Sequence, residues 1–415
     1  MKRKLSITVF LLLCVCPAWA QAQPILDLQP TVILVSLDGF RADYLEKYQP
    51  PLLNRLARRG ARARWMIPSF PTKTFPNHYT VATGLYPAHH GIVENNIYDA
   101  NFNAVFGLSK REEVQNPRWW LGEPIWVTAE KQGQKAGAFF FPGTEAAIGG
   151  ARPTYWREYD GKIPNAERVD TILSWLDKPR AERPTFLALY FSDVDDAGHD
   201  KGPDAPETKA AVLKVDADLS RLTAGLRERG VLSRVNLIIV SDHGMAAVNP
   251  KNAVFLDDAF DAKLAERVLS NDEIVQIFPK PGQEDAIYNS LRAKLPPQAK
   301  AYRKAEIPAR WRYRDGPRVA PIIVTPQEGW VLTTHERFNK QQAEGKLEGT
   351  RGAHGYDNAL PSMRALFIAH GAAIRRGRVV RPFSNIHVYN IMTRILNLRH
   401  ASNDGNFSAA KAVLR

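Results

Sequence analysis

Cysteine is almost absent from this chain of 415 residues, which contains only Cys14 and Cys16. Both lie in a segment with a basic start, an apolar run from Leu5 to Cys16 and a small-residue ending at Ala20. This pattern is typical of a secretory signal peptide, so we expect residues 1–22 to be cleaved and the protein to be periplasmic or secreted. The remaining chain would then have no disulfide and no thiolate metal site. Any metal must be held by imidazole or oxygen ligands.

Long apolar runs and local clusters of basic charge are also missing. The apolar run of the signal is shorter than the ~18 residues that a membrane anchor needs, and no later stretch of the sequence is long enough. We therefore expect no membrane span after signal cleavage. The formal net charge of +13 is spread along the chain, which argues against a nucleic-acid duplex as partner and favours an anionic small-molecule substrate. The sequence does not indicate an oligomeric state.

The sequence does contain short apolar runs that alternate with helical patterns. Continuous Val, Ile and Leu runs are typical of strands buried on both faces, as in a parallel sheet covered by helices. The runs span residues 31–37, 186–191, 237–240 and 365–369, and the helical patterns span 50–59, 205–229 and 388–398. This alternation predicts an α/β fold with a doubly wound, mostly parallel sheet and helices on both faces.

Domain boundaries follow from the same pattern. We expect one catalytic domain over residues 30–398, followed by a C-terminal tail at 399–415. The stretch from about 248 to 346 is less regular and rich in Pro, Arg and Lys. It is interpreted as a small appended subdomain or a set of long loops.

Acidic residues and histidines follow three of the apolar runs directly. Because the ligand site of such a sheet lies beyond the carboxyl ends of its strands, we expect these side chains to meet. Asp195 and His199, four residues apart, would lie on one side of a single turn of chain. Oxygen and imidazole ligands suit catalytic Zn²⁺, and two ions about 4 Å apart can bind the attacking and leaving oxygens of a displacement at phosphorus. The candidate ligands are Asp38, Thr74, Asp195, His199, Asp242, His243 and His354.

Each of these residues taken alone has an ordinary structural explanation. Asp38 before a glycine suits a turn, and an adjacent Asp-His pair is often a surface hydrogen-bonded pair. Pro76 is well placed in the first turn of a helix, which puts Thr74 at or beside the N-cap. A threonine there can simply cap the helix. A hydroxyl at a helix N-terminus that touches a divalent cation can also become a nucleophile.

The segment 72–79, followed by 83–87 and 90–92, resembles the nucleophile region of the nucleotide pyrophosphatase/phosphodiesterases. This family belongs to the alkaline-phosphatase-like superfamily, and the likeness runs from about residue 31 to 398, including 122–126, 241–245 and 354–358. The resemblance implies an alkaline-phosphatase-like fold and two Zn²⁺ ions. One ion would be held by Asp195, His199 and His354. The other would be held by Asp38, Asp242 and His243, with Thr74 bound to it as the nucleophile.

The resemblance also implies a reaction and a substrate. Thr74 would attack a nucleotide phosphodiester or phosphoanhydride bond, and water would release a nucleoside 5′-monophosphate from the covalent threonine intermediate. Asn95 would lie near the phosphate, where a neutral amide suits the single charge of a diester. Tyr155 matches a position that stacks on the base, although core packing explains it equally well. Leu108 and Phe75 complete the expected substrate-binding residues.

Other activities are compatible with the same metal site. A choline-phospholipid or glycerophosphodiester phosphodiesterase, or a phosphomonoesterase, would need similar ligands. The segment 102–118 favours nucleotides, because it resembles one that is missing from lysophospholipid-cleaving members. A sulfatase is excluded, because it needs a formylglycine made from Cys or Ser at the nucleophile position. This chain has Thr74 there. A non-catalytic secreted binding protein is the remaining class.

Overall fold

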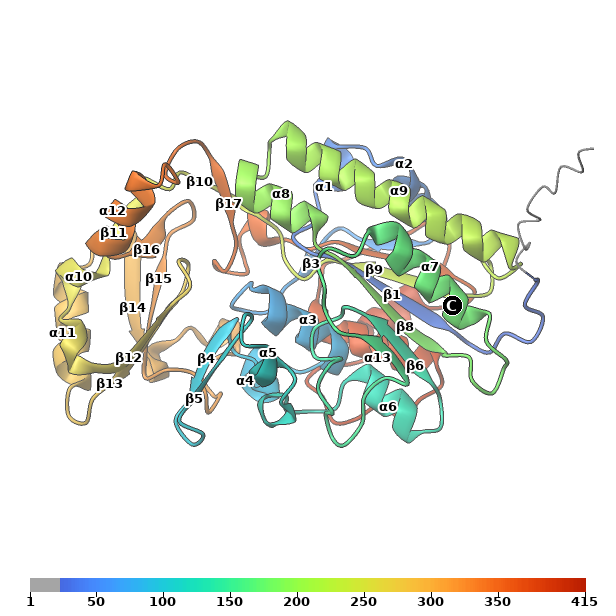
Figure 1. Cartoon of the computed structure of the whole chain (residues 1–415), viewed down its shortest axis with the longest axis horizontal. Coiled ribbons are helices and arrows are strands. Elements are labelled where there is room, and N and C mark those ends of the chain that lie inside the picture. The colour runs from blue at the N-terminus through green and yellow to red at the C-terminus, as the bar shows by residue number, and fades with distance from the viewer. Residues whose placement is uncertain (1–22) are drawn as a thin grey trace, which may run out of the picture.

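The computed structural model describes residues 23–415, so the expected signal peptide at 1–22 lies outside the described residues. Figure 1 shows a larger domain built on a central sheet and a smaller lobe beside it, formed by the yellow and orange elements. Within the described part of the chain, no helix combines the length and the apolar character needed to cross a membrane.

The central sheet has eight strands in the order β19-β2-β18-β9-β1-β8-β6-β7. Central strand β1 runs parallel to both of its neighbours, so that Val35 lies opposite Leu189 on one side and Ile239 on the other. Only β18 is antiparallel to its neighbours, and the mostly parallel sheet is therefore confirmed. The strands are β1 (Val32–Leu37), β2 (Ala61–Ala63), β6 (Ala136–Phe139), β7 (Tyr155–Arg157), β8 (Phe186–Phe191), β9 (Asn236–Val240), β18 (Phe367–Gly371) and β19 (Arg378–Val380).

Helices cover both faces of this sheet, which explains the unbroken apolar runs. Val32 and Leu34 belong to one buried apolar cluster, whereas Ile33 and Val35 belong to the other. Alternate residues of one strand thus point into two separate cores. One face is covered by α2 (Pro51–Arg59), α7 (Asn165–Leu176) and α9 (Pro206–Glu228), and the other by α3 (Thr74–Thr83), α6 (Ile125–Lys131) and α13 (Val388–Ile395). The three predicted helices are present as α2, α9 and α13.

Helix α2 is capped by a residue of another helix. Pro50 occupies its N-cap and offers no capping side chain. The buried Asp216 of α9 instead accepts hydrogen bonds from the backbone N–H groups of Leu52 (3.0 Å) and Leu53 (2.7 Å). These are two of the N–H groups that a helix cannot satisfy internally. Asp216 therefore fixes α2 against α9.

Replacing Asp216 with alanine is expected to lower the free energy of unfolding by about 1–2 kcal/mol, because both α2 amides lose their acceptor. Urea unfolding measures this change. Glu228→Ala removes an exposed carboxylate from the same helix and should change stability by less than about 0.5 kcal/mol. Equal stabilities of the two variants would contradict a capping role.

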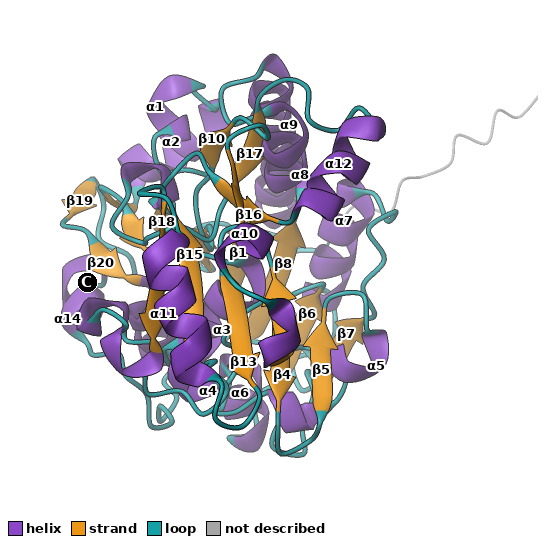
Figure 2. Ribbon diagram, turned by 90° about the vertical axis from the view of Figure 1, so that its left-hand side faces the viewer, coloured by secondary structure: helices purple, strands orange, loops and turns teal. Residues whose placement is uncertain are grey.

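The smaller lobe contains a four-stranded antiparallel sheet in the order β12-β13-β15-β14. Its strands are β12 (Ala265–Ser270), β13 (Val275–Pro279), β14 (Ala299–Arg303) and β15 (Ile322–Pro326). Helix α11 (Glu284–Lys294) packs on this sheet through Ile287 and Leu291, and these residues form a separate apolar cluster with α10 (Leu256–Ala259). Figure 2 shows α11 in front of the lobe's strands. The stretch that showed little sequence pattern thus contains regular structure.

The remaining elements are short. The expected C-terminal tail ends in α14 (Ser408–Val413), which packs into the core through Ala409, Ala410 and Val413. Strands β4 (Asn96–Asp99) and β5 (Ala104–Gly107) form a hairpin. The others are α1 (Tyr44–Lys47), α4 (Pro87–His90), α5 (Arg111–Val114), α8 (Asp193–Lys201), α12 (His335–Ala343), β3 (Met66–Ile67), β10 (Ala246–Val248), β11 (Ala253–Phe255), β16 (Val331–Thr333), β17 (Arg351–Ala353) and β20 (Phe383–Ser384).

Candidate active site

The predicted ligands meet beyond the carboxyl ends of β1, β8 and β9. Asp38 directly follows β1, and Asp242 with His243 follows β9. Strand β8 leads into α8, whose first turns carry Asp195 and His199 on one side. His354 follows β17, and Thr74 begins α3. The parallel arrangement of the three strands therefore assembles residues that are far apart in sequence.

Three of these side chains form one group. The Nε2 atoms of His199 and His354 lie 3.0 Å apart. The Asp195 carboxylate oxygens lie 3.4 Å from His199 Nε2 and 3.7 Å from His354 Nε2. Four residues form the adjoining second group, in which His243 Nε2 is 2.9 Å from Asp242 Oδ2, 3.4 Å from Asp38 Oδ1 and 3.4 Å from Thr74 Oγ1.

The histidine tautomers leave lone pairs facing into both groups. Each of the three rings places its Nδ1 within hydrogen-bond distance of a backbone carbonyl oxygen, which can only accept. Nδ1 must therefore carry the proton, and Nε2 is left with a lone pair. The contacts are His199 with Gly352 (2.9 Å), His243 with Gly244 (2.9 Å) and His354 with Thr72 (2.8 Å).

Buried carboxylate oxygens complete the donor set. Asp38 Oδ1, Asp195 Oδ1 and Asp242 Oδ2 have no hydrogen-bond donor among the described residues. Buried acceptors without donors are unfavourable unless a cation satisfies them. The residues therefore fit divalent cations, and a set of imidazole and carboxylate donors without sulfur suits zinc.

Electrostatics point to the same conclusion. Burial raises the pKa of Asp38 well above its usual value, and the neighbouring Asp242 and Asp195 carboxylates raise it further. Burial lowers the pKa of His354 well below its usual value, and the neighbouring His243 and Lys73 lower it further. His354 is therefore neutral at neutral pH. A neutral imidazole beside crowded carboxylates is a metal-binding arrangement.

Thr74 lies at the first position of α3, directly after the N-cap residue Lys73. Its hydroxyl thus faces the second group from a helix N-terminus, where partial positive charge favours an anion. The N–H of Phe75, which follows it, donates to Asn95 Oδ1 (3.0 Å). This contact fixes the amide of Asn95 so that its NH₂ group is the part free to donate to a ligand.

His78 is a buried residue of this site whose role the sequence analysis did not identify. Its Nδ1 lies 2.8 Å from the Thr74 carbonyl oxygen and 3.3 Å from Asp242 Oδ2, and its Nε2 lies 2.8 Å from Ser36 Oγ. These contacts make His78 a positioning residue between α3, which carries Thr74, and the second group. Its position four residues after Thr74, on the same side of the expected helix, is the sequence signal that could have indicated it.

The structure does not bring Tyr155 to the site. Tyr155 lies on edge strand β7, its ring stacks on Trp175 at 5.8 Å, and its hydroxyl donates to the carbonyl oxygen of Glu182. These contacts agree with the interpretation of Tyr155 as a residue of core packing rather than of base stacking. Leu108 is exposed at the end of β5, and Phe75 packs against Phe106 with 6.0 Å between ring centroids.

Tyr159, four residues after Tyr155, is an exposed aromatic residue beside the predicted ligands. It is 42% exposed, and its ring lies 6.4 Å from that of Tyr190, whose hydroxyl donates to Asp38 Oδ2 (2.6 Å). The sequence contains both tyrosines in one short segment. Only the turn of the chain after β7 determines which of them faces the site.

The smaller lobe also reaches the site. Lys73, next to Thr74, is buried and forms an ion pair with the buried Glu273, and its Nζ donates to the carbonyl oxygen of Asn271 (3.2 Å). The Asn271 side chain in turn donates to Glu94 Oε2 (2.6 Å). A cavity of about 520 Å³ lies between the lobe and the ligands, lined by Lys73, Asn95, Glu273 and His354 among others.

Comparisons with known proteins agree with this arrangement. A family model described as type I phosphodiesterase / nucleotide pyrophosphatase matches residues 32–357. The venom phosphodiesterase CdcPDE of Crotalus durissus collilineatus is 38% identical over 410 residues, which are 96% of this chain and 47% of the relative. Ectonucleotide pyrophosphatase/phosphodiesterase family member 3 of Rattus norvegicus is 36% identical over 396 residues, 93% of this chain and 44% of the relative. The chain spans about half the length of these two relatives.

Solved structures give the same result. Murine ectonucleotide pyrophosphatase/phosphodiesterase 5 superposes with a TM-score of 0.85 and 33% identity, covering 93% of this chain and 100% of that one. An inactive threonine-to-alanine variant of the murine protein in complex with AMP also has a TM-score of 0.85, at 32% identity, and covers 92% of this chain and 99% of that one. These matches identify a protein with an alkaline-phosphatase-like fold. More specifically, the chain belongs to the type I phosphodiesterase / nucleotide pyrophosphatase family.

Proposed function

We propose that this protein is a periplasmic or secreted zinc-dependent phosphodiesterase that hydrolyses nucleotide phosphodiester or phosphoanhydride bonds and releases nucleoside 5′-monophosphates. The observation that carries the proposal is the position of Thr74 Oγ1, 3.4 Å from His243 Nε2, beside two groups of inward-facing nitrogen and oxygen donors. Asp195, His199 and His354 would hold one Zn²⁺, and Asp38, Asp242, His243 and Thr74 the other. Bound ions would lower the pKa of the Thr74 hydroxyl and neutralise charge that develops on phosphate oxygens.

The proposed chemistry has two displacements at phosphorus. Thr74 Oγ1 loses its proton and forms a bond to phosphorus, while the bond to the leaving oxygen breaks on the opposite side. Water then forms a bond to the same phosphorus, and the bond to Thr74 Oγ1 breaks to release the monophosphate. The free NH₂ of Asn95 can donate to a non-bridging oxygen in both steps. Because it carries no charge, it suits a diester better than the dianion of a monoester, for which an arginine would be more favourable.

The exposed ring of Tyr159 offers a stacking surface for the base of a nucleotide substrate, worth about 1–3 kcal/mol per base. A choline group could contact the same ring through a cation–π interaction, so the preference over choline-bearing substrates rests on the segment 102–118. The solved complex of the murine relative with AMP is consistent with this choice. Phe75 and Leu108 would line the same subsite. Tyr159 would take the stacking role that the sequence analysis gave to Tyr155.

The function is tested by comparing ATP, a dinucleotide, a nucleotide sugar, glycerophosphocholine and p-nitrophenyl phosphate in the presence of zinc. We expect the three nucleotides to be cleaved fastest, with a nucleoside 5′-monophosphate as product. Tyr159→Ala should raise KM for nucleotides by about tenfold and leave hydrolysis of methyl p-nitrophenyl phosphate nearly unchanged. Tyr155→Ala is the matched control and should leave KM unchanged. Faster cleavage of glycerophosphocholine or of the monoester would contradict the proposal.

A further inference from the structure

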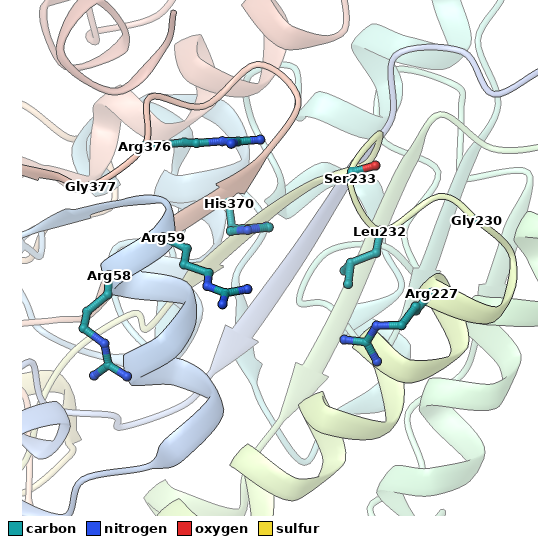
Figure 3. Close-up of a pocket in the computed structure, with 9 residues that line it drawn as sticks. All are labelled: Arg58, Arg59, Arg227, Gly230, Leu232, Ser233, His370, Arg376 and Gly377. Carbon is teal, nitrogen blue, oxygen red and sulfur yellow. The ribbon is translucent and has the colours of Figure 1, made fainter.

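A second cavity lies at the opposite end of the central sheet from the metal ligands. Its residue His370 pairs with Leu237 near the start of β9, whereas the catalytic residues follow the other end of that strand at Val240. The cavity has a volume of about 630 Å³ and lies between the ends of α2 and α9 and the turn before β19 (Figure 3). We call it the arginine groove. Its lining residues are Arg58, Arg59, Arg227, Gly230, Leu232, Ser233, His370, Arg376 and Gly377.

Positive charge in the arginine groove is not neutralised by the protein. Its lining contains four arginines and no acidic residue. Within residues 23–415, none of these four guanidinium groups forms a hydrogen bond or an ion pair. By contrast, Arg229, two residues after Arg227, forms an ion pair with Asp177 at 2.6 Å. Figure 3 shows Arg59 and Arg227 extending toward each other from opposite sides.

His370 adds a polar group to the same wall. Its Nδ1 is buried and has no hydrogen-bond partner in the described part of the chain. Burial lowers its pKa, and the charges of Arg376 and Arg59 lower it further. His370 is therefore a neutral imidazole that lies between Arg376 and Arg59 (Figure 3). An anion in the groove would relieve the repulsion among these groups.

The dipoles of α2 and α9 offset only part of the positive charge in the arginine groove. Arg58 and Arg59 lie in the last turn of α2, and Arg227 lies in the last turn of α9. A helix C-terminus carries about half a negative charge, so the two ends together offset about one guanidinium. Roughly three positive charges are left, and Arg376 does not lie on a helix at all.

The residue types define the kind of anion that fits. Guanidinium groups bind phosphate oxygens in a bidentate manner. A single phosphate would leave most of the four charges and of the cavity unused. The groove also has no Trp, Tyr or Phe on which a nucleobase could stack, and Leu232 is its single large apolar residue. These properties favour a compact anion with several phosphate groups over a nucleobase.

We propose that the arginine groove binds a small oligophosphate anion at a non-catalytic site separate from the metal centre. This inference does not depend on the proposed function, because no metal ligand or substrate-binding residue contributes to the groove. The site would hold a phosphate chain by its charge alone, without a base or a metal ion.

Isothermal titration with tripolyphosphate tests the inference on the zinc-loaded protein, in a Thr74→Ala background so that the probe is not consumed. We expect one binding event at the groove in addition to any event at the metal centre. Arg59→Gln with Arg227→Gln should weaken the groove event by at least about tenfold. Orthophosphate should bind the groove more weakly than tripolyphosphate.

The matched control is Arg55→Gln with Lys209→Gln. These exposed basic residues lie on the same two helices outside the groove and form no ion pair within the described chain, so the control removes the same net charge. It should keep the groove event within about twofold. Equal weakening by both double variants would show general attraction to a basic protein and overturn the proposal. It would also be overturned if the groove variant, with an unchanged melting temperature, bound tripolyphosphate as the parent does.

Discussion

Replacing Thr74 with alanine is expected to lower kcat by more than about 10³-fold, because the first displacement loses its nucleophile. Substrate affinity should change little, since Asn95 and Tyr159 stay in place. The loss is measured as kcat and KM on a nucleotide diester with zinc present. Thr74→Ser keeps a hydroxyl at the N-terminus of α3 and should retain measurable turnover. Near-parental rates for the alanine variant would remove Thr74 from the mechanism.

The stereochemical course of the reaction tests whether Thr74 is the nucleophile or only a metal ligand. Two in-line displacements at the same phosphorus invert it twice, so a chirally labelled diester should give net retention. Inversion would show a single displacement by water, with Thr74 acting only as a metal ligand. An intermediate trapped on Thr74 by rapid acid quench would give independent support.

Removal of divalent ions is expected to abolish turnover and to lower the melting temperature, because the carboxylates of Asp38, Asp195 and Asp242 lose the cations that satisfy them. An ion present at 1,000 times its Kd stabilises a protein by about 4 kcal/mol. Dialysis against EDTA followed by calorimetry and metal analysis measures both effects, and zinc should restore them. Unchanged activity and melting temperature after complete metal removal would contradict the metal centre.

A single-ligand variant separates the two ion sites. His199 is the most exposed of the three ligand histidines, with a side chain that is 42% exposed, so His199→Ala should still fold. We expect it to bind one ion fewer per chain and to lose about 10²-fold or more in kcat. His335→Ala changes an exposed histidine of the smaller lobe and should leave both quantities unchanged.

Much of the central domain could be predicted because its strands are covered on both faces. This burial makes 31–37, 186–191 and 237–240 continuous apolar runs, and the polar residues that end them mark one edge of the sheet. The gathering of Asp38, Asp242 and His243 follows from that rule. Their grouping is present in the structure, whereas their binding of zinc is a proposal that the experiments above test.

Features that depend on loops and on side-chain direction could not be predicted in this way. Tyr155 lies in β7, whereas Tyr159 follows the strand, and the path of the chain after β7 decides that Tyr159 lies beside the site. The sequence does not encode that path in a simple pattern. The strands of the smaller lobe are partly exposed, so they lack the unbroken apolar signal of β1. The arginine groove combines widely separated segments of the sequence, from Arg58 to Gly377, that come together only in the fold.

The buried ion pair between Lys73 and Glu273 limits how the smaller lobe can be exchanged between relatives. It joins the residue beside Thr74 to the turn between β12 and β13 of the smaller lobe. A substituted lobe without a carboxylate at position 273 would leave the Lys73 ammonium buried without its counter-charge, which is strongly destabilising. The lobe is therefore not an exchangeable module. Any chimera that transplants it between relatives has to carry a carboxylate at this position.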